Sequence, residues 1–80
     1  MLTEYIEAGL RHASCSWLAE DGGFFCEIPE LPGVWSTGAT EAEARAELRE
    51  VLEGWLALGL SLGHPLPIID GVEIVVQPMP

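Results

Sequence analysis

Hydrophobic residues recur along the first half of the chain with two different spacings. In residues 2–12 the apolar positions fall three and four residues apart, which is the stripe of an amphipathic helix. Residues 13–19 instead alternate, with Cys15 and Trp17 on one side, as in a strand with one buried face. Residues 24–28 form a second short apolar run. The pattern therefore predicts a helix followed by two strands.

The dipeptide Asp21-Gly22 lies between these strands and predicts a hairpin, because type I′ turns need positive φ at both central residues. A two-residue loop at this point places Trp17 opposite Cys26, so that Cys15 faces Ile28 rather than the other cysteine. The inward-facing set is then predicted to be Cys15, Trp17, Ala19, Phe24, Cys26 and Ile28.

The outward side of the predicted hairpin carries Leu18 and Phe25, which is unexpected for a solvated face. We predict that another element covers them or that they form an oligomer interface. Composition favours association, since 49% of the 80 residues are hydrophobic and a chain this short buries only part of its surface. Large leftover apolar patches usually mark protein interfaces.

The second half of the chain begins with Pro29 and Pro32, which remove backbone donors and end the preceding strand. Residues 34–37 are long enough for a third short strand. The segment Thr40-Glu41-Ala42-Glu43 fits a capping box, in which the threonine hydroxyl and the second glutamate satisfy free backbone amides. A helix is predicted to follow over residues 41 to about 60.

Gly63 suits the C-terminal cap of that helix, and the prolines after it prevent continuation. A turn at Asp70-Gly71 and the β-branched run 72–76 then predict a last strand. The order of elements is α-β-β-β-α-β. It predicts a single α+β domain over residues 1–80, with helices on one face of a small antiparallel sheet.

The charge of the chain is strongly acidic, because three arginines face 13 carboxylates for a formal net charge of −10. Such a chain repels phosphate backbones, so direct nucleic-acid binding is not expected. A basic protein partner would be steered toward it. The alternative is that the acidity only keeps a hydrophobic domain in solution.

The first residues lack the basic and apolar regions of a signal peptide, and nothing approaches a membrane span of ~20 apolar residues. We therefore expect a cytoplasmic protein without membrane contact. In that compartment Cys15 and Cys26 are expected to be reduced, buried thiols and not a disulfide.

No group of residues indicates catalysis, a metal centre or a cofactor. His12 and His64 lie at helix ends and lack the spacing of zinc ligands. The serines lack a nucleophile elbow, and the carboxylates of the second helix read as a solvated face. We expect no enzyme activity, no metal and no cofactor.

The segment 20–44 combines an acidic-glycine turn, an aromatic strand, the run Ile28-Pro29-Glu30-Leu31-Pro32-Gly33-Val34, and Gly38-Ala39-Thr40 before an acidic helix. In this order and spacing, with Gly63-His64-Pro65-Leu66-Pro67 after the helix, the chain resembles the HicB-like antitoxins. The resemblance implies a partial RNase H-like fold with a β-β-β-α-β core. It also implies dimers or larger assemblies, and binding of a small basic HicA-type toxin that cleaves mRNA. Many members carry a DNA-binding segment, which is not expected here because only four residues follow Val76.

Three functions follow from these patterns. In the first, an antitoxin-like protein contacts a basic toxin through Glu27, Glu30 and the acidic helix face, with Phe25 and Trp35 as apolar anchors. In the second, a self-associating domain without a toxin buries Leu18, Phe25 and Trp35 against another copy. In the third, a small-ligand carrier or enzyme needs a concave polar pocket that the sequence does not indicate.

Overall fold

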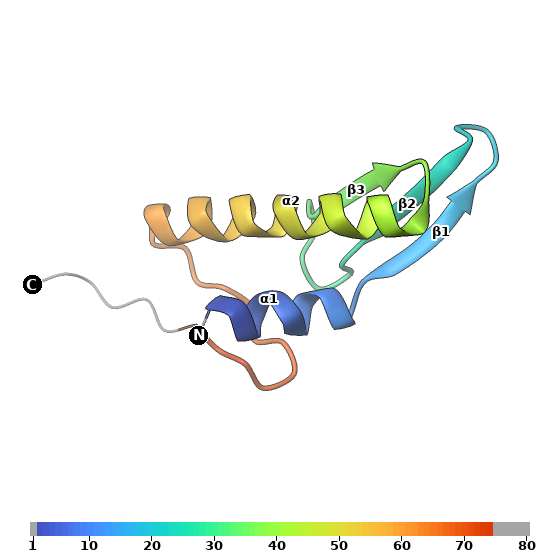
Figure 1. Ribbon diagram of the computed structural model, residues 1–80. Helices are drawn as coiled ribbons and strands as arrows, with labels where there is room; N and C mark the ends of the chain where they lie inside the picture. Colours follow the sequence, from blue (N-terminus) through green and yellow to red (C-terminus); the bar gives the residue numbers. More distant parts are fainter. Residues whose placement is uncertain (1, 75–80) are drawn as a thin grey trace, which may run out of the picture.

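A computed structural model of the chain describes residues 2–74. It contains two helices, α1 (Leu2–Arg11) and α2 (Glu41–Leu62), and three strands, β1 (Ser14–Leu18), β2 (Gly23–Glu27) and β3 (Trp35–Gly38). The strands form one antiparallel sheet in the order β1-β2-β3. The N-terminal part of α2 packs on the sheet, and its C-terminal part continues beyond the sheet, where α1 runs beside it (Figure 1). This arrangement confirms the predicted small α+β fold.

The first helix forms where its apolar stripe predicts it. Tyr5, Ile6, Ala8 and Gly9 are its buried residues. Gly9 allows α1 to approach α2 closely, because a Cβ at this position would lie 3.1 Å from Cδ2 of Leu52.

The hairpin between β1 and β2 differs from the predicted register by two residues. Trp17 pairs with Phe24 and not with Cys26. The turn is wider than a two-residue loop, because the carbonyl of Leu18 accepts hydrogen bonds from the amides of both Asp21 and Gly22. Gly22 takes the left-handed conformation, with a φ of 64°. A shift of two residues preserves which side chains share a face, so the predicted strand residues keep their sides. Ala19, which was predicted to face inward, instead lies in the turn and is exposed.

The observed register places Cys15 directly opposite Cys26, with Cα atoms 4.0 Å apart, and a disulfide joins them. The prediction of two separate thiols is therefore wrong. Two assumptions led to it: that the cysteines are reduced in the cytoplasm, and a register that placed each cysteine two residues away from its true partner. The disulfide ties the edge strand β1 to the central strand β2.

The core lies between the sheet and the two helices. Cys26 and Ser36 face α2, and the hydroxyl of Ser36 donates a hydrogen bond of 2.6 Å to the carbonyl of Ala44. The buried hydrophobic residues are Tyr5, Ile6, Ala8, Cys26, Ile28, Leu31, Val34, Ala44, Leu48, Leu52, Leu56 and Ile69. Trp17 was predicted to be buried, but 53% of its surface is exposed, although it lies on the same face as Cys15. Its ring packs against that of Phe24 with an angle of 68° between the rings.

The second helix begins and ends at the residues that the sequence indicates. Thr40 is its N-cap, and the hydroxyl of Thr40 accepts a hydrogen bond of 3.1 Å from the amide of Glu43. The side chain of Glu43 in turn accepts a hydrogen bond from the amide of Ala39, which completes the capping interaction. Gly63 ends the helix in the left-handed conformation, with a φ of 70°.

The segment after α2 returns to α1. The hydroxyl of Tyr5 donates a hydrogen bond of 2.6 Å to the carbonyl of Pro67, and Ile69 is buried. The predicted turn at Asp70-Gly71 is present, with positive φ at both residues and a bridge between Ile69 and Val72. Residues 72–74 do not form the predicted last strand, and residues 75 and 76, which complete that prediction, lie outside the described residues.

Candidate functional site: the open face of the sheet

One face of the sheet, which we call the open face, points away from α2. Strand alternation places Leu18, Phe25, Glu27 and Trp35 on this face, opposite the buried side chains of Cys26 and Ser36. Glu27 and Trp35 are exposed, and Leu18 and Phe25 are half-buried. The structure therefore brings four of the five predicted site residues onto one surface.

Two aromatic side chains dominate the open face. Phe25 of β2 and Trp35 of β3 stack with ring centroids 6.0 Å apart and an angle of 29° between the rings. They are diagonal neighbours, since Phe25 pairs with Thr37 and Trp35 pairs with Glu27. Trp35 is 54% exposed despite this contact. The pair forms an apolar ridge that leaves a large indole surface available to a partner.

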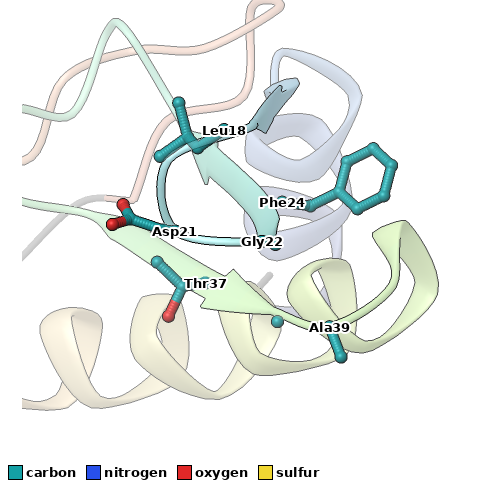
Figure 2. A pocket seen from close by; sticks show the side chains of 8 residues that line it. Leu18, Asp21, Gly22, Phe24, Thr37 and Ala39 are labelled. Atoms are coloured by element: carbon teal, nitrogen blue, oxygen red, sulfur yellow. The ribbon is translucent and has the colours of Figure 1, made fainter.

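A hollow of about 500 Å³ lies beside the hairpin turn at one end of the open face. The side chains of Leu18, Asp21 and Thr37 lie around it, while the ring of Phe24 points away (Figure 2). Three glycines, Gly22, Gly23 and Gly38, also line it. A second hollow of about 230 Å³ adjoins the aromatic pair. The open face is therefore a ridge between two depressions, a shape suited to the side chains of another protein.

Glu27 adds a negative charge beside the aromatic ridge. It pairs in register with Trp35 on one side and with Ser14 on the other. The hairpin turn carries two more exposed carboxylates, Glu20 and Asp21. The open face is therefore apolar at its centre and acidic at its margin.

Glu30 is placed elsewhere, because its carboxylate is 2.5 Å from Nδ1 of His12. The other ring nitrogen of His12, Nε2, is 2.5 Å from Oδ1 of Asp70, and Nε of Arg11 is 3.3 Å from Oδ2 of the same carboxylate. The hydrogen bond to Asp70, followed by that to Glu30, raises the pKa of His12 above its ordinary value. The hydrogen bond from His12, followed by that from Arg11, lowers the pKa of Asp70.

This cluster of His12, Glu30 and Asp70 joins the end of α1, the proline turn and the tail. Both ring nitrogens of His12 are engaged by carboxylates, so the imidazole has no free nitrogen for a metal ion. Within residues 2–74 no group of three or more metal-ligating side chains is placed to hold a metal. The sequence gives no sign of this cluster, because 18 and 58 residues separate His12 from its partners and no local pattern indicates the contacts.

The acidic face of α2, the remaining predicted contact surface, is exposed as expected. The predicted pairs of Arg45 with Glu41 and of Arg49 with Glu53 are present, with N–O distances of 2.9 and 3.8 Å.

Neither helix within residues 2–74 is both long enough and apolar enough to span a membrane.

The family model described as UPF0150-like matches residues 4–67, which is most of the chain. The chain belongs to the UPF0150-like family. A curated UPF0150 protein of Synechocystis, ssl0738, is 46% identical over 35 residues, which cover 44% of this chain and 49% of that protein. The match thus spans about half the length of this relative.

A solved protein of similar size supports the fold of this UPF0150-like chain. The crystal structure of TTHA0281 from Thermus thermophilus superimposes with a TM-score of 0.89 and 38% sequence identity. The match covers 95% of this chain and 94% of that one. None of these names states an activity.

Proposed function

We propose that this UPF0150-like protein is an antitoxin of the HicB-like type, which binds and neutralises a small basic mRNA-cleaving toxin. The observation that carries the proposal is the stacked pair of Phe25 and Trp35 on an exposed sheet face of a chain with a net charge of −10. Exposed tryptophan is a common anchor of protein interfaces.

The charge of the chain supports a basic partner. A protein that binds RNA must present a positive surface to the phosphates. An acidic protein is steered toward the same positive surface, and once bound it excludes the RNA. Lysine or arginine side chains of the partner would pair with Glu27 and lie over the indole of Trp35, where cation–π attraction contributes about 0.5–2 kcal/mol.

The motif that carries the resemblance to HicB-like antitoxins has a structural role in this chain. Ile28, Leu31 and Val34 of the proline-framed turn are buried, and the amide of Ile28 donates a hydrogen bond to the carbonyl of Val34. The turn thereby fixes where β3 begins and where Trp35 points. The resemblance supports the proposed function through this shared scaffold.

A self-associating module without a toxin is the second candidate function, with Leu18 and Phe25 as its interface. Both side chains lie on the open face, which favours this alternative. The acidic margin opposes it, because a symmetric contact through this face brings Glu27 and Asp21 of two copies near each other. We therefore favour the basic partner.

The proposal is tested by capture at low and high salt followed by an RNA-cleavage assay. The tagged chain is incubated with lysate of its source, and any small basic protein that it retains is purified and tested on RNA with and without the chain. We expect RNA cleavage that the wild-type chain blocks, and capture that weakens as salt increases.

The matched control uses two tryptophans on opposite faces of the sheet. Trp35→Ala should lose capture and inhibition, while Trp17→Ala should keep both, because Trp17 is equally exposed but lies on the helix side. The proposal is overturned if no RNA-cleaving protein is retained, or if Trp35→Ala inhibits the toxin as well as wild type does.

A further inference from the structure

The character of α2 changes abruptly after Glu53. Most outward side chains of its first part are charged, and two pairs of them form i, i+4 ion pairs. Residues 54–69, by contrast, contain no aspartate, glutamate, lysine or arginine, which is the longest such stretch in a chain of net charge −10. The C-terminal part of α2 lies beyond the sheet (Figure 1). Its residues 54–62 therefore carry no aspartate, glutamate, lysine or arginine side chain.

The uncharged part of α2 carries a second apolar stripe in addition to the one that faces the core. We define the outer stripe as five exposed residues at helical spacing: Gly54, Ala57, Leu58, Ser61 and Leu62. Leu58 is 59% and Leu62 is 57% exposed, whereas Leu52 and Leu56 on the inner stripe are buried. A helix that is apolar on all sides is normally buried on all sides. Within residues 2–74, no element covers the outer stripe.

A hollow lies directly beside the outer stripe. It measures about 220 Å³ and is lined by Trp55, Leu58, Leu62 and Leu66 among others. The same patch thus presents projecting leucine side chains and an apolar depression of a size that receives such a side chain. A surface with both features fits its own copy across a two-fold axis, because each partner then supplies a leucine to the hollow of the other.

We infer that the outer stripe of α2 is a homodimer interface, where two copies of this chain pack helix against helix. The small residues Gly54, Ala57 and Ser61 alternate with leucines, which lets two helices approach closely and interdigitate. The distribution of charge selects a second copy as the occupant. A basic partner finds no carboxylate in residues 54–69, whereas two acidic chains meet there with the least mutual repulsion.

This inference is independent of the open face and of the proposed toxin. The dimer leaves Phe25 and Trp35 of both copies available, so one dimer presents two open faces. Salt should act on the two interactions in opposite directions. Screening weakens the attraction between an acidic chain and a basic partner, but it also weakens the repulsion between two chains of charge −10 and so strengthens the dimer.

The test is sedimentation equilibrium over a range of protein and salt concentrations. An interface formed by half of one helix is small, on the order of 1,200 Å² in total or less, so dimer formation should depend on concentration. We expect wild type to reach the mass of a dimer, at lower concentration when salt is high. Leu58→Glu places two carboxylates in the interface and should raise the dissociation constant at least ~10-fold.

Two further variants keep the result interpretable. Ala46→Glu adds the same charge at an exposed position in the first part of α2 and should leave the dimer unchanged. Phe25→Glu alters the open face and should also leave it unchanged. Circular dichroism of Leu58→Glu should match wild type, since Leu58 is exposed and not part of the core.

The inference is overturned if wild type sediments as a monomer at all concentrations, or if Leu58→Glu keeps the wild-type dissociation constant. If Phe25→Glu loses the dimer instead, the interface lies on the open face and not on the outer stripe. Leu58→Glu should still capture and inhibit any toxin that wild type inhibits, so failure of the proposed function and failure of this inference are distinguishable.

Discussion

His12 and Asp70 are 58 residues apart in the sequence, yet Nε2 of His12 lies 2.5 Å from Oδ1 of Asp70. The contact fastens the tail to the end of α1, where Arg11 also approaches the same carboxylate. Glu30 binds the other side of the imidazole and joins the proline turn to it. Three segments are therefore held together by the imidazole of His12.

Stability should depend on pH through this contact. The pKa of His12 is raised above its ordinary value of 6.5, so the stability that it contributes is complete below about that pH and is lost as pH rises through the folded-state pKa. The pKa of Asp70 is lowered below its ordinary value of 3.8, so its contribution is present above that pH and is lost as pH falls through the folded-state pKa. Both contributions are complete between these two ordinary values.

Thermal unfolding of wild type and His12→Gln at pH 5 and pH 9 measures the effect. Wild type should exceed the variant in Tm at pH 5, and the difference should shrink at pH 9. His64→Gln, which removes the other imidazole outside this cluster, is the control variant. An equal Tm difference at both pH values would show that His12 acts only through packing.

Reduction of the disulfide between Cys15 and Cys26 should lower the free energy of unfolding. Cysteines 11 residues apart close a short loop in the unfolded chain, and opening such a loop costs about 2–3 kcal/mol. Urea unfolding with and without a dithiol reductant tests this. Cys15→Ser should be insensitive to the reductant, and a thiol titration of the oxidised wild type should find no free thiol. Two titratable thiols in that sample would contradict the disulfide.

Loss of the N-cap should destabilise α2. Thr40→Ala removes the hydroxyl that accepts from the amide of Glu43 and should cost about 1 kcal/mol. Thr40→Ser retains the oxygen and should lie close to wild type. Urea midpoints of the three proteins give the comparison, and an equal loss in the serine variant would assign the effect to the threonine methyl group.

Gly38 should not tolerate a side chain, because a Cβ there would lie 2.5 Å from the backbone nitrogen of Ala44. Backbone atoms of α2 must then move, so Gly38→Ala should cost about 1–3 kcal/mol. Ala39→Ser adds one atom at the exposed neighbouring position and should change stability by less than about 0.5 kcal/mol. Equal urea midpoints for Gly38→Ala and wild type would show that β3 and α2 can separate at little cost.

The two helices and the first three strands, with their faces, follow from the sequence, because they depend on neighbours a few residues apart. The capping residues Thr40 and Glu43 lie three positions apart, and both capping interactions are present as predicted. The period of two along the strands placed Leu18 and Phe25 on the outward face even though the predicted register was wrong. A register shift by an even number of residues does not exchange the faces of a strand.

Tertiary structure decided what depends on contacts between distant residues. The width of the hairpin turn brought Cys15 and Cys26 together, and the return of the tail brought Asp70 to His12. The extent of the covering helix left Trp17 exposed, although its alternation with Cys15 is that of a core residue. Periodicity determines which face of an element a side chain takes, but burial and pairing depend on where the rest of the chain lies, and that is fixed only when all elements pack together.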